Sequence, residues 1–360
     1  MRQWFPSRRD VLRAAGMAGA AMCWPRIGAA SSHSTGVLPI EGSWISILFD
    51  DRRHHYWNEQ CRAYSAEQWA AAVRDVADLG MEYLVLKSVA KGGEAFYDTP
   101  LLPKAELACD DPIEALLASA DALGVKFFMS SDWYGDWDHN AIVDPALMRI
   151  RVQMMSELVE KYGHHESFYG WYWPNEAYLT PYFTGPFVAH INACSAEARK
   201  LTPKAKTLIA PYFTHKAVYD ERFVRQLAGL DVDIIAYQDE VGCYRVTPEE
   251  IARSYELLRR AHDKVPQRKL WADVEVFTWE GPPNKQTSPL IPASFERVER
   301  QLKAVSPFVE KTLIYQYQGL LSKPGSKAPA GPPQAEQLYR DYVAWLQAHH
   351  PDMLRRSLSE

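Results

Sequence analysis

Trp171-Tyr172-Trp173-Pro174-Asn175-Glu176 is an aromatic run that stops at an Asn-Glu pair. A second run, Leu270-Trp271-Ala272-Asp273-Val274-Glu275, also ends at a carboxylate. Short apolar runs rich in aromatic and β-branched residues are typical of parallel strands that helices cover on both faces. Each run therefore predicts a buried strand that places a glutamate at its carboxyl end.

Outward from these two runs, strands and helices alternate along the chain. The predicted strands are residues 45–50, 83–89, 126–132, 169–175, 207–212, 233–238, 270–275 and 312–318. Apolar residues spaced three and four apart predict helices at 65–79, 111–123, 144–162, 187–201, 221–230, 248–262, 293–309 and 332–349. This alternation predicts an α/β fold, a (β/α)8 TIM barrel. A doubly wound open sheet is the alternative, but the sequence contains neither a GxGxxG nor a Walker motif.

The loops predicted after the strands are longer than those before them. Gly80 and Gly124 stand shortly before a strand, where a preceding helix can end in the left-handed conformation. The long loops that follow strands are residues 51–64, 90–110, 133–143, 177–186, 278–292 and 319–331. In a (β/α)8 barrel such loops share the C-terminal face, where active sites are formed. The sequence therefore predicts a walled cleft on that face.

The first 30 residues have the composition of a targeting segment. Arg8 and Arg9 precede a short Ala-, Gly- and Met-rich run, and Gly28-Ala29-Ala30 offers a cleavage site. This order resembles a twin-arginine export signal, and the apolar run is shorter than the about 20 residues that span a bilayer. We therefore expect the twin-arginine export machinery to deliver a single barrel domain, residues 31–360, to the periplasm or the medium.

Composition excludes some classes of partner. The chain carries a net charge of −5 and has no run of Lys and Arg, which argues against nucleic acid and anionic membrane surfaces. Four cysteines follow the targeting segment, without the spacing of a zinc or redox motif. A disulfide between Cys61 and Cys109 is the best pairing in an oxidising compartment, but buried thiols are favoured.

Counting strands places Glu176 after the fourth and Glu275 at the end of the seventh. Cleavage of a glycosidic bond requires one carboxyl that protonates the leaving oxygen and one that attacks the anomeric carbon or activates a water. Aromatic neighbours should keep Glu176 protonated as the acid/base, with Glu275 ionised as the nucleophile of a retaining glycoside hydrolase. Asp273 shares the strand face of Glu275 and is expected one layer deeper. An inverting reaction with Asp239 or Glu240 as the base is the alternative.

Other polar and aromatic residues at strand ends and in long loops are expected to bind the sugar. Asn175 would hydrogen-bond the 2-hydroxyl group, an interaction that strengthens in the transition state. The remaining predicted substrate contacts are Asp50, His54, Lys87, Asp132, Trp133, Trp173, Tyr212, Tyr237, Gln238, Asp239 and Gln316. Further candidate stacking platforms are Trp57, Trp137 and Trp279.

No metal ion or other cofactor is expected. The segment Asp50-Asp51-Arg52-Arg53-His54-His55 is the strongest metal candidate, but adjacent histidines point in different directions in most backbones. No His-x-His or helical His-x3-His pair supports them. His164-His165 precedes the fourth strand, at the opposite end of the barrel, and is expected to form a solvated turn.

Asn175-Glu176 after strand four and Glu275 after strand seven resemble the acid/base and nucleophile positions of clan A glycoside hydrolases. Residues 42–318 also resemble the glycosyl hydrolase barrels grouped as domain of unknown function 4434. The residues that carry this second resemblance are Ile47-Leu48-Phe49-Asp50, Trp173-Pro174-Asn175-Glu176 and Ile234-Ile235-Ala236-Tyr237-Gln238-Asp239. It implies a barrel and an oligo- or polysaccharide substrate, without a defined reaction.

Two other functions stay open at this point. A non-catalytic glycan-binding barrel would have the same aromatic residues, with its carboxylates too far apart or held in salt bridges. A lyase or metal-assisted enzyme acting on uronic acids would use Lys87, His54 or Tyr237. The acidic composition is a modest argument against a polyanionic substrate.

Overall fold

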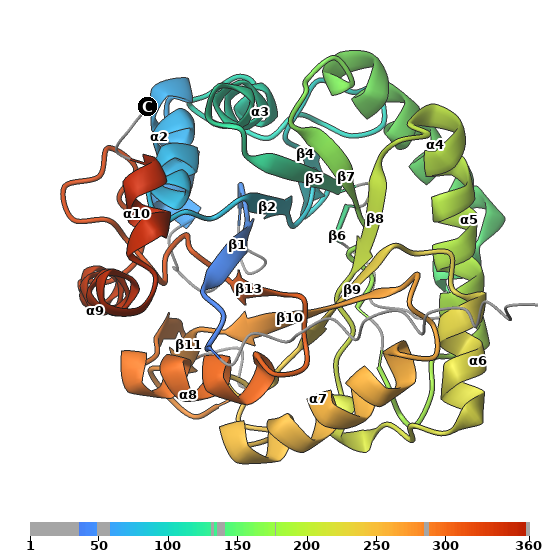
Figure 1. Ribbon diagram of the computed structural model, residues 1–360. Coiled ribbons are helices and arrows are strands. Elements are labelled where there is room, and N and C mark those ends of the chain that lie inside the picture. The colour runs from blue at the N-terminus through green and yellow to red at the C-terminus, as the bar shows by residue number, and fades with distance from the viewer. Residues whose placement is uncertain are drawn as a thin grey trace, which may run out of the picture. The chain divides into compact units, whose positions relative to one another are not determined.

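Parallel strands close into a barrel, and helices surround it (Figure 1). The computed structural model describes residues 36–48, 58–130, 133–134, 141–176, 178–283 and 288–357, all within the unit Thr35–Glu360. In chain order, the eight barrel strands are β1 (Ile40–Ile45), β2 (Tyr83–Leu86), β5 (Lys126–Ser130), β7 (Phe168–Tyr172), β8 (Lys206–Ile209), β9 (Ile234–Gln238), β10 (Lys269–Glu275) and β13 (Lys311–Tyr315). Each pairs in parallel with the next, and β13 pairs with β1. The predicted (β/α)8 barrel is confirmed.

One long helix follows each barrel strand. These helices are α2 (Ala66–Ala77), α3 (Pro112–Leu123), α4 (Pro145–Tyr162), α5 (Gly185–Leu201), α6 (Glu221–Gly229), α7 (Pro248–His262), α8 (Phe295–Val305) and α9 (Gln334–His349). Local signals explain their ends. Ser65 and Gln68 form a capping box at the start of α2, and Gly124 ends α3 in the left-handed conformation at φ 66°.

The loops that follow barrel strands carry additional short elements. These are α1 (Asn58–Arg62), β3 (Ala90–Lys91), β4 (Glu94–Ala95), β6 (Trp133–Tyr134), η1 (Ala141–Val143), η2 (Thr214–Lys216), β11 (Phe277–Trp279) and β12 (Leu290–Pro292). Strands β3, β4 and β6 form one small sheet, and β11 pairs with β12. A last helix, α10 (Pro351–Ser357), follows α9. The C-terminal face of the barrel therefore has the elaborated loops that the sequence predicted.

Strand β1 starts five residues earlier than predicted. Gly42 and Ser43 lack the apolar character of a strand, yet they pair with both neighbouring strands. A Cβ at Gly42 would lie 2.6 Å from a side-chain atom of Leu313, so the glycine allows this close approach. Strands β2, β5, β7, β8 and β13 end two or three residues before the predicted position, because the residues that follow already belong to the loops, whereas β9 and β10 end where predicted.

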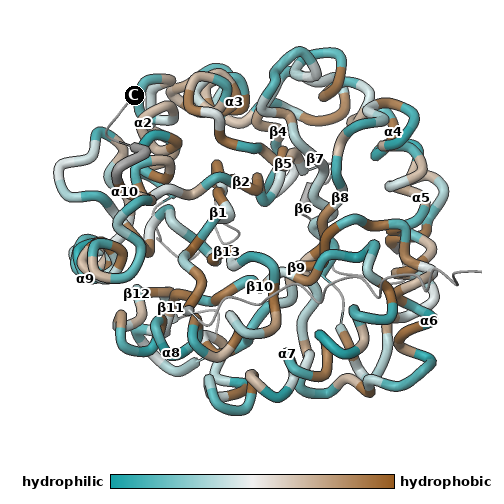
Figure 2. Tube along the Cα trace, in the orientation of Figure 1, coloured by the Kyte–Doolittle hydropathy of each residue, from teal (hydrophilic) through white to brown (hydrophobic). Residues whose placement is uncertain are grey.

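Side chains alternate between two apolar layers. One layer fills the barrel interior and contains Trp44, Tyr83, Val85, Phe128, Tyr172, Leu208, Ala210, Ile234, Ala236, Trp271 and Leu313. The other lies between the strands and the helices. Figure 2 shows apolar segments along the strands and hydrophilic segments on the outer parts of the helices. Because successive strand residues face opposite layers, alternation decides which strand-end residues can reach a site at the mouth of the barrel.

Cys61, Cys109, Cys194 and Cys243 are not disulfide-bonded, so the Cys61–Cys109 pair does not form. The thiol of Cys61 instead accepts a hydrogen bond of 2.8 Å from Nε2 of Gln318. Within the described ranges, no helix is both long enough and apolar enough to cross a membrane. The predicted signal segment, residues 1–30, lies outside the described residues, and its role stays a prediction.

Candidate active site

A cavity of about 330 Å³ opens where the barrel strands end. Its lining comes from the ends of β1, β7, β9, β10 and β13, from residues just after β2 and β7, and from the loops after β9 and β10. The lining residues are Trp44, Lys87, Tyr172, Glu176, Gln238, Cys243, Asp273, Glu275, Phe277, Trp279, Leu290 and Tyr315. Both glutamates predicted from the sequence, Glu176 and Glu275, therefore border one cavity.

Glu176 lies four residues beyond the end of β7 and is half-buried. Burial raises the pKa of its carboxyl group, although the positive charge of Lys87 and a hydrogen bond from the side chain of Gln238 oppose the shift. A buried carboxyl with a raised pKa keeps its proton longer than one in water and can act as a general acid.

Two lysines set the charge around Glu176. The ammonium of Lys87 donates a 3.0 Å hydrogen bond to the hydroxyl of Tyr315 and lies 4.7 Å from the centre of that ring. Burial lowers the pKa of Lys87, but Tyr315 and Glu176 outweigh it and leave the pKa raised, so this lysine stays charged. Burial lowers the pKa of Lys91, in β3, to about 7 against the opposing charge of Glu176. Sequence reasoning missed Lys91, because nothing local marks a loop lysine as close to Glu176.

The peptide groups of Glu275 are held on both sides. Its backbone N–H donates to Oδ1 of Asp239 at 3.1 Å, and its carbonyl accepts from Arg297 at 2.8 Å and from Gln301 at 3.0 Å. The carboxylate oxygen Oε2 accepts a 2.7 Å hydrogen bond from the backbone N–H of Cys243. The last residue of β10 is therefore fixed by groups from α8 and from the loop after β9, which limits the positions that its carboxyl group can take.

Glu275 is buried beside other carboxyl groups, and this raises its affinity for a proton. Burial is the largest cause, the charge of Asp239 is the next, and together they raise the pKa of Glu275 to about 8. This corrects the expectation that Glu275 is ionised at neutral pH, because the hydrogen bond from the backbone N–H of Cys243 does not offset burial among acidic groups. Asp273 lines the floor of the same cavity, as expected from its strand face, and burial with the charge of Glu275 raises its pKa well above the ordinary range. Oδ1 of Asp273 is buried without a hydrogen-bond partner in the part of the chain that the structure describes.

The two residues considered as alternative bases do not line the cavity, which corrects those predictions. Asp239 is fully buried outside the cavity lining, and it accepts a 2.6 Å hydrogen bond from Gln301 and a 3.1 Å hydrogen bond from the backbone N–H of Glu275, so it supports Glu275. Glu240 accepts from the backbone N–H of Thr214 at 2.8 Å and lies 3.1 Å from Nδ1 of His215. Burial raises the pKa of Asp239 to about 6 and that of Glu240 to about 7.

Alternation also corrects two aromatic predictions. Trp173 is 1% exposed and its Nε1 donates to Ser195 of α5 at 3.2 Å, so its ring packs between sheet and helix. Tyr237 is fully buried, and its hydroxyl lies 3.2 Å from Nε2 of His262 in α7. Their chain neighbours Tyr172 and Gln238 face the cavity in their place.

The other predicted contacts divide into three groups. Lys87 and Gln238 line the cavity, as predicted for substrate contacts. Gln316 does not line it, because its side chain is fully buried and accepts a hydrogen bond from the hydroxyl of Ser46; its prediction as a substrate contact is therefore corrected. Asn175 and Tyr212 are half-buried outside the lining, and Oδ1 of Asn175 lies 3.0 Å from Nε2 of His190. The predictions that lie outside the described residues are Asp50, His54, Trp57, Asp132, Trp137 and the side chain of Trp133.

Aromatic side chains form much of the cavity wall, and most of them were not predicted as substrate contacts. Trp44 and Tyr172 meet edge to face with ring centres 5.8 Å apart, and both belong to the interior layer. Trp279, a predicted platform, donates from Nε1 to the carbonyl of Gly242 at 3.0 Å. Trp44 was not predicted because it lies in the part of β1 that precedes Ile45, where the predicted strand begins. Tyr315 is the last residue of β13, but the predicted strand continued to residue 318, so Tyr315 was not recognised as a strand-end residue.

Gly242 approaches Glu275 so closely that a side chain would displace it. A Cβ at Gly242 would lie 2.8 Å from Cβ and 2.9 Å from Oε2 of Glu275. We expect Gly242→Ala to displace the carboxyl group of Glu275, and a shift of about 1 Å would lower about 100-fold the rate of any reaction in which that group takes part. Gly185→Ala, where no atom lies within 4 Å of the added Cβ, is the matched control. Equal rates for the two variants would show that the position of Glu275 does not matter.

Solved structures with a similar fold include enzymes that act on sugars. A candidate α-L-fucosidase from Bacteroides thetaiotaomicron has a TM-score of 0.68 and 17% identity, covering 86% of this chain and 96% of that one. A β-galacturonidase from Eisenbergiella tayi has a TM-score of 0.54 and 15% identity, covering 86% and 51%. An endo-1,4-β-mannanase from Rhizomucor miehei has a TM-score of 0.51 and 11% identity, covering 86% and 95%.

At these identities the similarity shows a shared barrel fold, and the chain spans about half the length of the β-galacturonidase. No curated protein matches the chain. The family described as domain of unknown function 4434 matches residues 40–328, and the chain belongs to that family.

Proposed function

We propose that the protein is a retaining glycoside hydrolase, with Glu176 as acid/base and Glu275 as nucleophile. The observation that carries this proposal is the shared cavity, which both carboxyl groups border from different strands. Their environments differ, since Glu176 is next to the charged Lys87, whereas Glu275 is among carboxyl groups and accepts a backbone hydrogen bond. Pairs of carboxyl groups in different environments are the usual way to hold one proton in such a site.

The proposed reaction has two steps. In the first, Glu275 must lose the proton that its raised pKa favours, and its carboxylate then attacks the anomeric carbon while Glu176 gives its proton to the oxygen of the departing sugar. In the second, Glu176, now ionised, takes a proton from a water molecule that replaces Glu275 at the anomeric carbon. The N–H of Cys243 stabilises the negative charge of Glu275 before attack and after release.

The walls of the cavity favour a saccharide. Trp44, Phe277, Trp279 and Leu290 offer apolar surface to a sugar ring, and Lys87 and Gln238 offer polar groups to its hydroxyls. Its volume falls within the about 300–1,000 Å³ of small-molecule sites.

An aromatic cluster lies next to Glu176 outside the cavity. The ring of Tyr178 lies 4.5 Å from that of Tyr212 and 5.3 Å from that of Phe213, centre to centre. Tyr178 is 38% exposed. Burial and then Tyr178 raise the pKa of Tyr212, and the charge of Glu176 adds to that shift. A ring surface next to the proposed acid suits a second sugar unit, which supports an oligo- or polysaccharide substrate. Export of the protein by the twin-arginine route to the periplasm or the medium would bring it to such a substrate.

A panel of 4-nitrophenyl glycosides and polysaccharides tests the proposal. We expect the protein to hydrolyse at least one of them, and ¹H NMR of the first product should show the anomeric configuration of the substrate. Hydrolysis with inversion would remove Glu275 as nucleophile. Binding measured by calorimetry, without hydrolysis of any panel member, would instead identify a glycan-binding barrel.

A further inference from the structure

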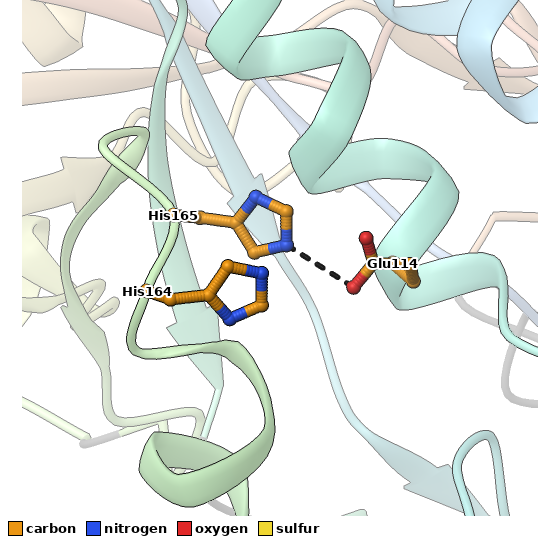
Figure 3. Close-up of side chains that lie close together, drawn as sticks. All are labelled: Glu114, His164 and His165. Carbon is orange, nitrogen blue, oxygen red and sulfur yellow. Dashed lines mark hydrogen bonds and ion pairs between the residues drawn. The ribbon is translucent and has the colours of Figure 1, made fainter.

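A second group of charged and imidazole side chains lies away from the cavity. His164 and His165 occupy the loop between α4 and β7, at the end of β7 opposite to Glu176, and Glu114 lies in the first turn of α3. Figure 3 shows both imidazole rings on the side of their loop that faces Glu114. The prediction of a solvated turn holds for His164, which is exposed, but is wrong for His165, which is only 7% exposed.

His165 is held in one orientation by two carboxylates. Its Nδ1 lies 2.6 Å from Oδ2 of Asp121, and its Nε2 lies 3.1 Å from Oε2 of Glu114. Asp121 is fixed in turn, since its Oδ1 accepts a 2.6 Å hydrogen bond from the backbone N–H of Ser167. The ring of His164 lies 4.2 Å from that of His165, with 35° between their planes. These two adjacent histidines thus point the same way.

This arrangement matches the requirements of a zinc site. One nitrogen of each histidine and one oxygen of Glu114 lie within 4.8 Å of one another. Tetrahedral ligands about 2.1 Å from Zn²⁺ are roughly 3.4 Å apart, a spacing that exposed His164 can reach by a small side-chain rotation. A histidine that binds a metal usually donates its other N–H to a carboxylate, which is the place of Asp121 here.

We propose that Glu114, His164 and His165 bind one Zn²⁺ ion, with water as the fourth ligand. Imidazole and carboxylate groups select transition metals such as Zn²⁺ over Mg²⁺ and Ca²⁺, which prefer oxygen ligands alone. The ion would join α3 to the loop that enters β7. Because these residues are separate from the cavity lining, the site would stabilise the barrel without taking part in the proposed hydrolysis.

Calorimetric titration of the untagged protein with ZnCl₂ tests this site. We expect His164→Ala and Glu114→Gln each to remove one bound equivalent or to weaken its Kd at least 10-fold. Glu166→Gln, the same charge change in the same loop, and His349→Ala, another exposed histidine, should bind as the unchanged protein does. Zinc bound by histidines outside the described residues should be the same in all these proteins, so the difference between each variant and the unchanged protein reports this site alone.

Thermal unfolding supplies an independent measurement. Zn²⁺ in excess should raise the Tm of the unchanged protein and of the two controls, and the part of that shift due to this site should be lost in His164→Ala and Glu114→Gln. MgCl₂ should leave all Tm values unchanged. If the two site variants retain every zinc equivalent and the full Tm shift, the three side chains form an ion-paired cluster only, and the proposal is wrong.

Discussion

Glu275→Gln is expected to lower kcat/KM by about 10³-fold or more on every substrate, because a neutral amide cannot attack the anomeric carbon. Glu176→Gln should lose about 10²- to 10⁴-fold on polysaccharide, the contribution typical of a general acid. It should lose much less in glycosylation by a 4-nitrophenyl glycoside, whose leaving group departs without a proton. Initial rates of both variants on both kinds of substrate separate the two roles.

Glu41→Gln is the control for this pair. Glu41 lies at the amino end of β1, at the other end of the barrel, and its partner is Lys311. The substitution removes the same charge from a barrel strand without touching the cavity. Equal losses in all three variants would mean that the rates report damage to the barrel, and full activity of Glu275→Gln would end its assignment as nucleophile.

Glu275→Gln should also make the protein more stable at alkaline pH. Burial first, and the charge of Asp239 second, raise the pKa of Glu275 to about 8 from an ordinary value of 4.5. The folded protein therefore binds this proton more tightly than the unfolded chain does, and its stability falls as pH rises from 4.5 to 8. The glutamine variant lacks this cost, so its advantage in the free energy of unfolding should grow to on the order of 2–4 kcal/mol at pH 8.

Chemical denaturation at pH 5 and at pH 8 measures this difference. Glu166→Gln, which replaces an exposed glutamate, should differ from the unchanged protein by the same small amount at both pH values. If the advantage of Glu275→Gln is also constant with pH, Glu275 is ionised in the folded protein throughout this range. Its environment would then be more polar than the buried carboxyl cluster indicates.

Local patterns were sufficient to predict the barrel. Strands and helices differ in the spacing of their apolar residues, and counting the strands along the sequence places Glu176 and Glu275 on the same face of the barrel. The exception was β1, where Gly42 and its polar neighbours form a strand because of pairing with strands far away in sequence. Such pairing leaves no local signal.

The details of the site were less predictable, for two physical reasons. Side-chain direction depends on strand register, so Trp173 and Tyr237 were assigned to the cavity although their neighbours Tyr172 and Gln238 face it. Support of Glu275 depends on contacts between distant segments. Gln301, for example, donates to Asp239 from 62 residues away, and no spacing along the chain marks this pair.

Covalent trapping tests the central claim most directly. The protein would be incubated with the 2-deoxy-2-fluoro derivative of the sugar that the substrate panel identifies, carrying a good leaving group. Such a derivative slows the second step and leaves the sugar attached to the nucleophile. Peptide mass spectrometry should find one sugar per chain on the peptide that contains Glu275 and none in Glu275→Gln. A sugar attached to any other carboxylate would contradict the account.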